Sequence, residues 1–367
     1  MQKQILCSSK KKMDTILVIL VVLLMAIGLV ILYSTSEYNG LVRFHDSAYY
    51  FIKQLFATFL GLIAMYLISR MDYHFLIGLA PVFYLVSAVL STLVLFIGDE
   101  INGSKRWLSL GTFSFQPAEF AKLAVILFLS WTIIHCKKRQ GIRYMIWVFL
   151  LVLPIVGLVG TNNLSTAVII LGIACLLIFV SNPYYIQFVG VGAAGILFLG
   201  AFLAMESYRL ERLAVWRNPE AYEKGFQTLQ GLLAIGSGGL FGVGLGNSMQ
   251  KLGFVPEAQN DMIFSIICEE TGLVGAILLL GLFSLLLWRL TKIAMSAADL
   301  EGLLIAAGIL GHIALQVLLN VAVVTNTIPN TGITLPFISY GGTSVLFLLS
   351  EMGLALSVSR YGLSLWE

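Results

Sequence analysis

The side chains best suited to chemistry lie in residues 246–261, directly before a long apolar run that begins at residue 262. Lys251, Glu257 and Asp261 are the ionisable residues of this segment. An ionised carboxylate beside hydrocarbon is costly, so a chain that keeps one there usually uses it. We therefore predict that Asp261 is a general base, a role that requires a carboxylate within reach of the proton it removes. The simpler alternative is that Asp261 only caps a helix, where aspartate is favoured.

A second group of candidate residues lies at positions 106–122. Arg106 and Trp107 precede Pro117, which is a residue typical of the first turn of a helix, and Glu119 and Lys122 follow it. Glu119 and Lys122 are three residues apart, so they lie on one helix face and can form an ordinary ion pair. Trp107 can be a membrane-interface anchor. The functional interpretation is that an acid and a base one turn into a span, below an Arg-Trp loop, bind an anion.

Two segments rich in glycine offer further polar contacts. Residues 237–246 are small and uncharged, and their glycines either serve turns or let backbone N–H groups approach a phosphate. Residues 325–344, which include Ser339, combine glycine, proline and hydroxyl side chains. Irregular backbone at membrane depth must be buried in protein or line a wet cavity. The segment is therefore either ordinary packing, as in a broken transporter helix, or a source of hydrogen-bond donors for sugar or pyrophosphate oxygens.

Glu269 and Glu270 are a conspicuous acidic pair, but they do not extend the predicted site. At 100° per residue, Glu270 points almost opposite to Asp261 and Glu269 about 80° away. We therefore expect one base, and not the two opposed carboxylates of a glycoside hydrolase.

The elements that must position these residues are membrane helices. Hydrophobic residues make up 59% of the chain and charged residues 11%, against roughly 25% charged in soluble domains, and the mean hydropathy is +0.93. A span needs roughly 17–25 apolar residues. We predict an all-α membrane bundle of about ten spans, forming one domain over residues 1–367 with a large outer loop at 205–261. The expected spans are 15–35, 52–69, 75–98, 118–135, 145–160, 163–181, 184–204, 262–289, 302–325 and 335–358. The first is expected to be a retained span, because no small-residue cleavage site follows it.

Basic residues predict the orientation. The short segments before the first span, between the fourth and fifth, and after the eighth carry ten of the 22 Lys and Arg residues: Lys3, Lys10, Lys11, Lys12, Lys137, Lys138, Arg139, Arg143, Arg289 and Lys292. The positive-inside rule makes this side cytoplasmic. Both termini are then inside, and loops 36–51, 99–117, 205–261 and 326–334 face outward.

Several functional classes are disfavoured. Cys7 and Cys136 are predicted to be cytoplasmic and Cys175 and Cys268 to lie inside spans, so no disulfide framework is expected in the outer loops. The four histidines are scattered, which disfavours a zinc site. The sequence carries no Gly-x-x-x-x-Gly-Lys-Ser/Thr phosphate loop, so energy is expected from the substrate or a gradient, not from ATP.

The motifs together resemble the SEDS family (shape, elongation, division and sporulation). They are Asn102-Gly-x-x-Arg-Trp, Gln116-Pro-Ala-Glu-x-x-Lys, Gly242-x-Gly-x-Gly-x-Ser-x-x-Lys, Pro256-Glu-x-x-x-Asp, Glu269-Glu-x-Gly and Pro329-x-Thr-Gly-x-x-Leu-Pro. They occur in order over most of the chain. Details resemble the division branch (FtsW) or the sporulation branch (SpoVE) more than the elongation branch (RodA). One departure is Asn163, in a segment where members often carry an aspartate, so no role of that acid is carried over.

The resemblance implies a bacterial peptidoglycan glycosyltransferase that polymerises lipid II on the outer face of the cytoplasmic membrane, with septal synthesis in division as the expected role. Asp261 is then the base. The other expected substrate-binding residues comprise cations for the pyrophosphate, acids that orient them or the sugar, and two neutral residues: Arg106, Lys122, Lys251, Glu119, Glu257, Trp107 and Ser339.

The resemblance also implies a divalent cation, Mg or Mn, whose ligands are unknown. Expected partners are lipid II and the nascent glycan strand, a class B penicillin-binding protein, other divisome membrane proteins and membrane lipids, with no nucleic acid. The alternatives are a lipid II flippase, a non-catalytic scaffold for a transpeptidase, and an elongation polymerase of the RodA branch. A carrier would need ionisable groups near the midplane within broken helices. The sequence places the candidates at one membrane face, which favours surface chemistry.

Overall fold

The computed structural model describes residues 13–101, 104–110, 113–135, 142–181, 190, 192–193, 200 and 213–362. In this part of the chain eight helices are long and apolar enough to cross a membrane. They are α1 (Thr15–Phe44), α2 (Tyr49–Arg70), α4 (Ala80–Ile97), α5 (Pro117–His135), α7 (Leu164–Ser181), α11 (Ile263–Met295), α12 (Leu300–Val324) and α13 (Gly342–Tyr361). A shorter apolar stretch, Ile146–Asn162, belongs to α6 (Ile142–Asn162). The predicted helical membrane bundle is confirmed, while the run expected at 184–204 lies largely outside the described residues.

Several predicted boundaries are wrong. Helix α1 continues to Phe44 instead of ending near residue 35, and His45 in the left-handed conformation closes it. The expected loop 36–51 shrinks accordingly to a short turn before α2. The run at 75–98 is two helices, α3 (Tyr73–Gly78) and α4, which meet at Leu79. Within the loop predicted to face outward, α10 (Phe226–Ser237) follows two single-turn 3₁₀ helices, Pro219–Ala221 and Glu223–Gly225.

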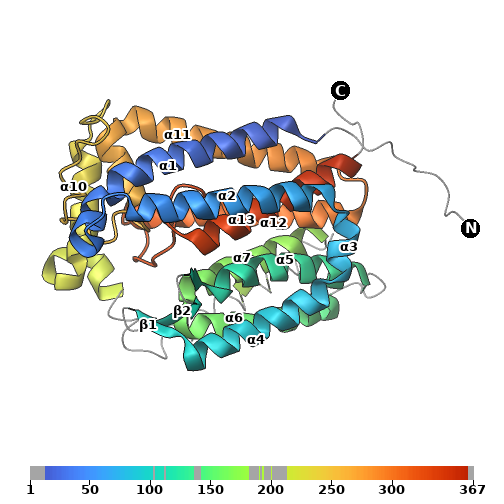
Figure 1. Cartoon of the computed structure of the whole chain (residues 1–367). Coiled ribbons are helices and arrows are strands. Elements are labelled where there is room, and N and C mark those ends of the chain that lie inside the picture. Colours follow the sequence, from blue (N-terminus) through green and yellow to red (C-terminus); the bar gives the residue numbers. More distant parts are fainter. Residues whose placement is uncertain are drawn as a thin grey trace, which may run out of the picture.

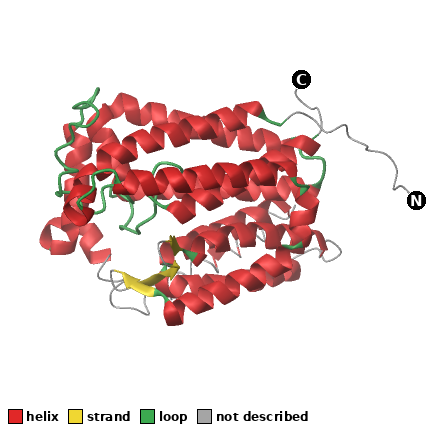
Figure 2. Ribbon diagram, in the orientation of Figure 1, coloured by secondary structure: helices red, strands yellow, loops and turns green. Residues whose placement is uncertain are grey.

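A small antiparallel sheet occupies a segment that was predicted to be only a loop. Strands β1 (Asp99–Ile101), β2 (Ser104–Leu110) and β3 (Phe113–Phe115) pair in the order β1-β2-β3. Trp107 pairs with Asp99 on one side, and Leu108 pairs with Phe115 on the other. Figure 2 shows the strands and the longest loops at the same end of the bundle. The sheet holds Arg106 and Trp107 directly before α5.

Different polar contacts hold neighbouring segments together at the two ends of the bundle. At one end Arg289 Nε lies 2.7 Å from Asp14 Oδ2, and the Arg360 guanidinium donates to the backbone carbonyl of Ser69 over 2.8 Å. At the other end Thr343 Oγ1 donates to the carbonyl of Ser114 over 2.9 Å. Figure 1 shows the start of α1 and the end of α13 at the first end and α10 with the strands at the second. The loops at the second end are the ones predicted to face outward.

His74 connects α3 with the start of α12 at the first end. Its ring nitrogens lie 2.7 Å from Asp72 Oδ1 and 2.7 Å from Asp299 Oδ2. Burial lowers the pKa of His74, but the two carboxylates outweigh burial and raise the pKa above its ordinary value.

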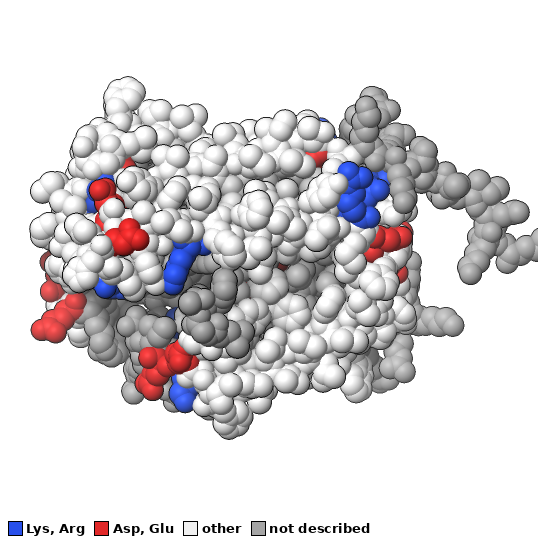
Figure 3. All heavy atoms as spheres, in the orientation of Figure 1, with Lys and Arg blue, Asp and Glu red and all other residues white. Residues whose placement is uncertain are grey.

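The surface agrees with a membrane location. On the face shown in Figure 3, the visible charged side chains gather near the two ends, and an uncharged band separates them. Exposed apolar residues within the spans include Phe59 of α2 and Leu278 and Leu285 of α11. An apolar belt between two charged ends is the arrangement expected for a protein that spans the bilayer.

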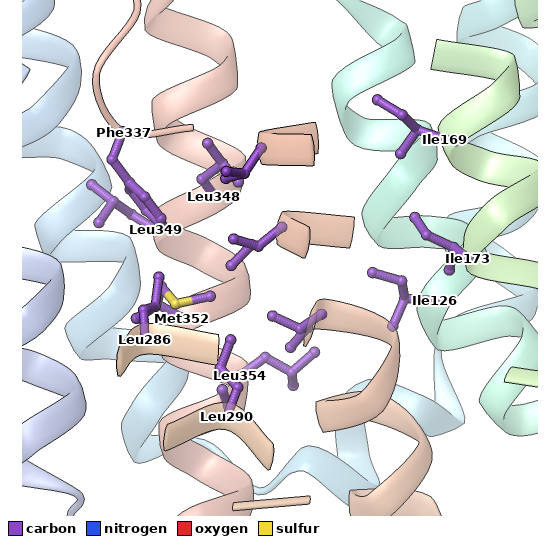
Figure 4. Packing of buried hydrophobic residues seen from close by; sticks show 14 of the residues in the cluster. Ile126, Ile169, Ile173, Leu286, Leu290, Phe337, Leu348, Leu349, Met352 and Leu354 are labelled. Atoms are coloured by element: carbon purple, nitrogen blue, oxygen red, sulfur yellow. The ribbon is translucent and has the colours of Figure 1, made fainter. Parts of the chain in front are cut away.

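The interior is built around α12. Gly308 of α12 faces Ile126 of α5 so closely that an added Cβ would lie 2.7 Å from the Ile126 side chain, and Gly311 meets Leu176 of α7 in the same way at 2.3 Å. These small residues let α5 and α7 approach α12. Figure 4 shows Ile126, Leu348 and Met352 in the buried apolar cluster.

The glycine-rich segment 237–246 packs backbone against backbone on a break in α11. Gly272 interrupts the helix with φ 67°. Its Cα lies against the segment so closely that a Cβ would be 2.4 Å from the Gly242 nitrogen. The N–H groups of Gly242, Val243 and Gly244 donate to the carbonyls of Gly238, Glu269 and Glu270 respectively. These three N–H groups already have backbone acceptors. The structure therefore favours the interpretation that the glycines serve turns, and disfavours the interpretation that these N–H groups bind a phosphate.

We predict that Gly242→Ala lowers the thermal midpoint of the purified protein. Gly242 has φ 78°, and a Cβ there would lie 2.2 Å from the Glu270 carbonyl oxygen, so the change should cost more than about 1 kcal/mol. Gly236→Ala in α10 is the matched control, because Gly236 has no neighbour within 4 Å and alanine suits a helix better. Equal midpoints for the two variants would contradict the packing role.

Candidate active site

A cavity of about 310 Å³ opens at the end of the bundle that carries the strands and α10. Segments far apart in the sequence contribute to it: β2, the starts of α5 and α7, the segment before α11, and the irregular residues 332–344. Its polar lining consists of Arg106, Trp107, Ser114, Gln116, Glu119, Lys122, Asn163, Ser165, Thr166, Glu257, Asn260, Asp261, Gln316, Thr334, Tyr340 and Ser344.

Six of the eight residues predicted from the sequence line this cavity, namely Arg106, Trp107, Glu119, Lys122, Glu257 and Asp261. Lys251 and Ser339 are not among its lining residues. The structure thus brings the segments 106–122 and 257–261 together, although more than 130 residues separate them in the sequence.

Glu119 and Lys122 form a buried ion pair on the first turns of α5. Lys122 Nζ lies 3.0 Å from Glu119 Oε1, and Lys122 is 1% and Glu119 6% exposed. Pro117 begins the helix, so Glu119 lies in its first turn, where the helix dipole favours a carboxylate. Lys122 Nζ also donates to Gln316 Oε1 on α12 over 3.3 Å. The pair exists as predicted, and both members also face the cavity.

Asp261 lies at the cavity wall next to α11 but does not cap that helix. The helix begins at Ile263 with Met262 as its cap residue. The Asp261 carboxylate lies near Gly332, where an added Cβ would be 3.8 Å from Oδ2. Asn320 Nδ2 donates to the backbone carbonyls of Asp261 over 2.9 Å and of Ile333 over 2.7 Å. Asn320 thereby fixes the backbone that carries Asp261, and the capping interpretation is wrong.

Glu257 stands on a strained turn four residues earlier. Its φ is 55°, a conformation that non-glycine residues seldom adopt. Its carboxylate accepts a hydrogen bond from Asn260 Nδ2 and lies 3.9 Å from Arg43 NH1. With a side chain 32% exposed, Glu257 can contact a ligand that enters the cavity.

Arg106 joins the sheet to the junction of α6 and α7. Its Nε donates to the Asn162 carbonyl over 2.7 Å, and Asn162 Nδ2 donates to the Lys105 carbonyl over 2.9 Å. Asn163 lines the cavity, and its Oδ1 accepts from the Thr166 nitrogen over 3.2 Å.

Lys251 lies in a separate buried cluster. Its Nζ is 2.9 Å from Glu270 Oε1 and donates to Ser34 Oγ of α1 over 2.9 Å. Glu269 accepts from Ser248 Oγ and from the Met249 nitrogen. Neither acid lines the cavity, in agreement with the prediction that they need not share a site with Asp261.

Ser339 has a structural contact. Its Oγ accepts from the Leu335 nitrogen over 2.8 Å and closes the turn before α13. The residue is 4% exposed, so its hydroxyl is held inside the protein.

The sequence interpretation missed a polar face of α12. His312, Gln316 and Asn320 recur at intervals of four and are all buried. That spacing within an apolar span was a readable signal, since polar residues in membrane helices face the protein interior. His312 Nδ1 lies 2.8 Å from Glu351 Oε2 of α13. The sequence analysis placed the ionisable candidates at one membrane face, and this pair in the middle of α12 and α13 is an exception to that prediction.

The part of the chain that the structure describes contains no group of three or more His, Cys, Asp or Glu residues placed to hold a metal ion. Two carboxylates, Glu257 and Asp261, line the cavity. Mg²⁺ commonly binds one or two carboxylates together with phosphate oxygens of a substrate. The cavity therefore fits a cation that arrives with a pyrophosphate better than a metal site made of protein ligands alone.

A membrane helix bundle with a polar, charged cavity at one end defines the class of this protein. The family model described as "Cell cycle protein", for FtsW, RodA and SpoVE, matches residues 14–363. The chain therefore belongs to the FtsW/RodA/SpoVE family.

Individual relatives agree along nearly the whole length. Stage V sporulation protein E of Bacillus subtilis is 40% identical over 96% of this chain and 99% of its own. A probable peptidoglycan glycosyltransferase FtsW of Trichlorobacter lovleyi is 35% identical over 94% and 93%. Among solved structures, a chain of a peptidoglycan synthase complex has a TM-score of 0.78 at 32% identity, covering 95% of this chain and 98% of that one. The rod shape determining protein RodA of Thermus thermophilus has a TM-score of 0.71 at 32% identity, covering 95% and 97%.

We predict that Glu119 and Lys122 contribute to stability as a pair and to activity separately. Removing one partner leaves a buried unpaired charge, so the Glu119→Gln/Lys122→Met double variant should have a higher thermal midpoint than the worse single variant. Its rate of lipid II polymerisation should be no better than that of the slower single variant, because both side chains face the cavity. A double-mutant cycle on midpoint and rate measures both effects. Recovery of the rate in the double variant would reduce the pair to a structural role.

Proposed function

We propose that this chain is a peptidoglycan glycosyltransferase that polymerises lipid II at the outer face of the cytoplasmic membrane. The observation that carries the proposal is one cavity at one end of the bundle, lined by Asp261, the Glu119–Lys122 pair and Arg106. The names of the FtsW relatives and the likeness to a chain of a peptidoglycan synthase complex support the same activity.

The reaction needs one base and several cations. A sugar hydroxyl of the acceptor attacks the anomeric carbon of the donor, a new glycosidic C–O bond forms, and the bond from that carbon to the polyprenyl pyrophosphate breaks. Asp261 accepts the hydroxyl proton. Lys122 and Arg106 hold the pyrophosphate while its negative charge develops. Glu119 orients Lys122, and Glu257 and Trp107 contact the sugar.

A divalent cation fits the same arrangement. Glu257 and Asp261 are the cavity carboxylates that would hold it together with pyrophosphate oxygens, and a bound cation would neutralise charge on the leaving group. Lys251 and Ser339 have no part in this proposal, because their side chains are engaged away from the cavity.

The biological setting of the proposal is septal or sporulation synthesis with a class B penicillin-binding protein and other divisome membrane proteins. Stage V sporulation protein E and FtsW proteins are the similar relatives that support this branch. RodA structures share the fold, so elongation is the alternative role. The peptidoglycan synthase complex supports the existence of a cross-linking partner.

A flippase is the second candidate, because one observation favours it. The His312–Glu351 pair lies near the middle of α12 and α13, and α11 is broken at Gly272. Midplane ionisable groups and broken helices are features of carriers. The pair is buried and does not line the cavity, so the transferase is preferred. Polymerisation of lipid II in detergent requires no transport and separates the two functions.

We predict that Asp261→Asn abolishes polymerisation without loss of folding. Asparagine has almost the same size but cannot accept the proton, and loss of a general base typically costs about 10²–10⁴ in rate. The measurement is glycan strand formation from labelled lipid II by the purified protein with its penicillin-binding partner, with the thermal midpoint as the folding control. A rate within a few-fold of the wild type would remove Asp261 from the mechanism.

We predict that the cavity end of the bundle faces outward. Glu220→Cys and Ala298→Cys place exposed thiols in the loop before α10 and in the turn between α11 and α12, at opposite ends of the bundle. In intact cells an impermeant thiol reagent should label the first variant and not the second, and lysis should expose the second. The reverse pattern would place the cavity on the cytoplasmic side and exclude the proposed reaction.

A further inference from the structure

The pair formed by His312 and Glu351 has no part in the chemistry described so far. Its atoms His312 Nδ1 and Glu351 Oε2 are 2.8 Å apart, and the residues are 1% and 0% exposed. Within the described part of the chain, His312 Nε2 and Glu351 Oε1 have no hydrogen-bond partner. Ionisable groups at the middle of membrane helices are costly, so their presence requires an explanation.

The pair is the inner end of a polar face that leads to the cavity. On α12, Gln316 lies one turn from His312, and Asn320 lies one turn further. Gln316 Oε1 accepts from Lys122 Nζ, and Gln316 Nε2 donates to the Thr334 carbonyl over 3.0 Å. Asn320 holds the backbone carbonyl of Asp261. The rotation of α12 about its axis and its position along that axis therefore set the positions of Lys122 and Asp261, two residues assigned to the reaction.

Electrostatics link the pair to the ion pair on α5. The charge of Glu119 interacts with Lys122 and also with His312. Glu119, Lys122, Glu351 and His312 together make two acids and two bases, all buried.

We propose that His312 and Glu351 are positioning residues for glycosyl transfer. Glu351 on α13 fixes the His312 ring and with it the polar face of α12. That face then holds Lys122 through Gln316 and the Asp261 backbone through Asn320. Neither member of the pair touches the substrate. The inference rests on the proposed transferase function.

The experiment compares His312→Gln, Glu351→Gln and the double variant by kcat, KM and thermal midpoint, in lipid II polymerisation with the penicillin-binding partner. Each single variant should lose between about 10-fold and 100-fold in kcat, the range typical of misplaced catalytic groups, with KM within about twofold. The double variant leaves no unpaired charge, so its midpoint should recover towards the wild type. Its kcat should stay low, because the positioning contact is still absent.

Two control variants accompany the series. Glu351→Asp keeps the charge and should retain more kcat than Glu351→Gln. Ser350→Ala removes a neighbouring buried hydroxyl that bonds only its own helix, at Leu346, and should leave kcat unchanged. The double variant keeps the test valid if a single variant fails to fold.

Recovery of kcat together with the midpoint in the double variant would overturn the proposal, since the pair would then only stabilise the fold. Single variants with wild-type kcat would overturn it equally. Both outcomes presuppose an active wild type, and in that case the proposed function stands. A folded wild-type complex that forms no glycan strands would instead refute the proposed function, and the positioning role with it.

Discussion

The burial of the Lys122 ammonium is the constraint on which the arrangement of the cavity depends. A cation that is 1% exposed inside an apolar bundle must have partners, because an isolated charge there is strongly unfavourable. Glu119 supplies the opposite charge, and Gln316 supplies an acceptor on a neighbouring helix. These partners require α5 and α12 to approach closely, and the small residue Gly308 permits that approach. The buried Lys122 ammonium therefore requires α5 to pack against α12, and this packing in turn keeps the ammonium away from solvent.

The same constraint explains how a largely apolar protein holds a polar site at its end. Asp261 and Glu257 belong to an irregular segment, yet the segment is tied down by contacts to regular elements. Asn320 binds the Asp261 carbonyl, and Asn39 of α1 donates to the Gln259 side chain over 2.8 Å. The buried cluster around Lys251 fixes the preceding residues to α1 and α11. The loop is therefore positioned by side chains of the bundle, although it has little regular structure of its own.

The sequence was sufficient for the fold class and for much of the cavity, because hydropathy and a few charged positions in motifs are local signals. It did not predict the strands around Arg106, since they are only three to seven residues long and strand propensity depends strongly on context. The length of α1 was underestimated because residues 34–40, Ser-Thr-Ser-Glu-Tyr-Asn-Gly, interrupt the apolar run although the helix continues through them. Lys251 was misplaced for a related reason: a lysine near a glycine run resembles a phosphate ligand, and only the tertiary structure reveals Glu270 and Ser34 beside it. Gln316 and Asn320 were readable from their spacing but were overlooked within an apolar run.

The cavity is assembled from segments that span most of the chain, from Arg106 on β2 to Ser344 at the start of α13. Membrane proteins are inserted as they are synthesised, and the wall formed by residues 332–344 leaves the ribosome after the segments that carry Lys122 and Asp261. A nascent chain with its earlier helices in the bilayer therefore has Asp261 and Lys122 but lacks one side of the enclosure. The order of synthesis itself delays assembly of the cavity until the start of α13 has been made.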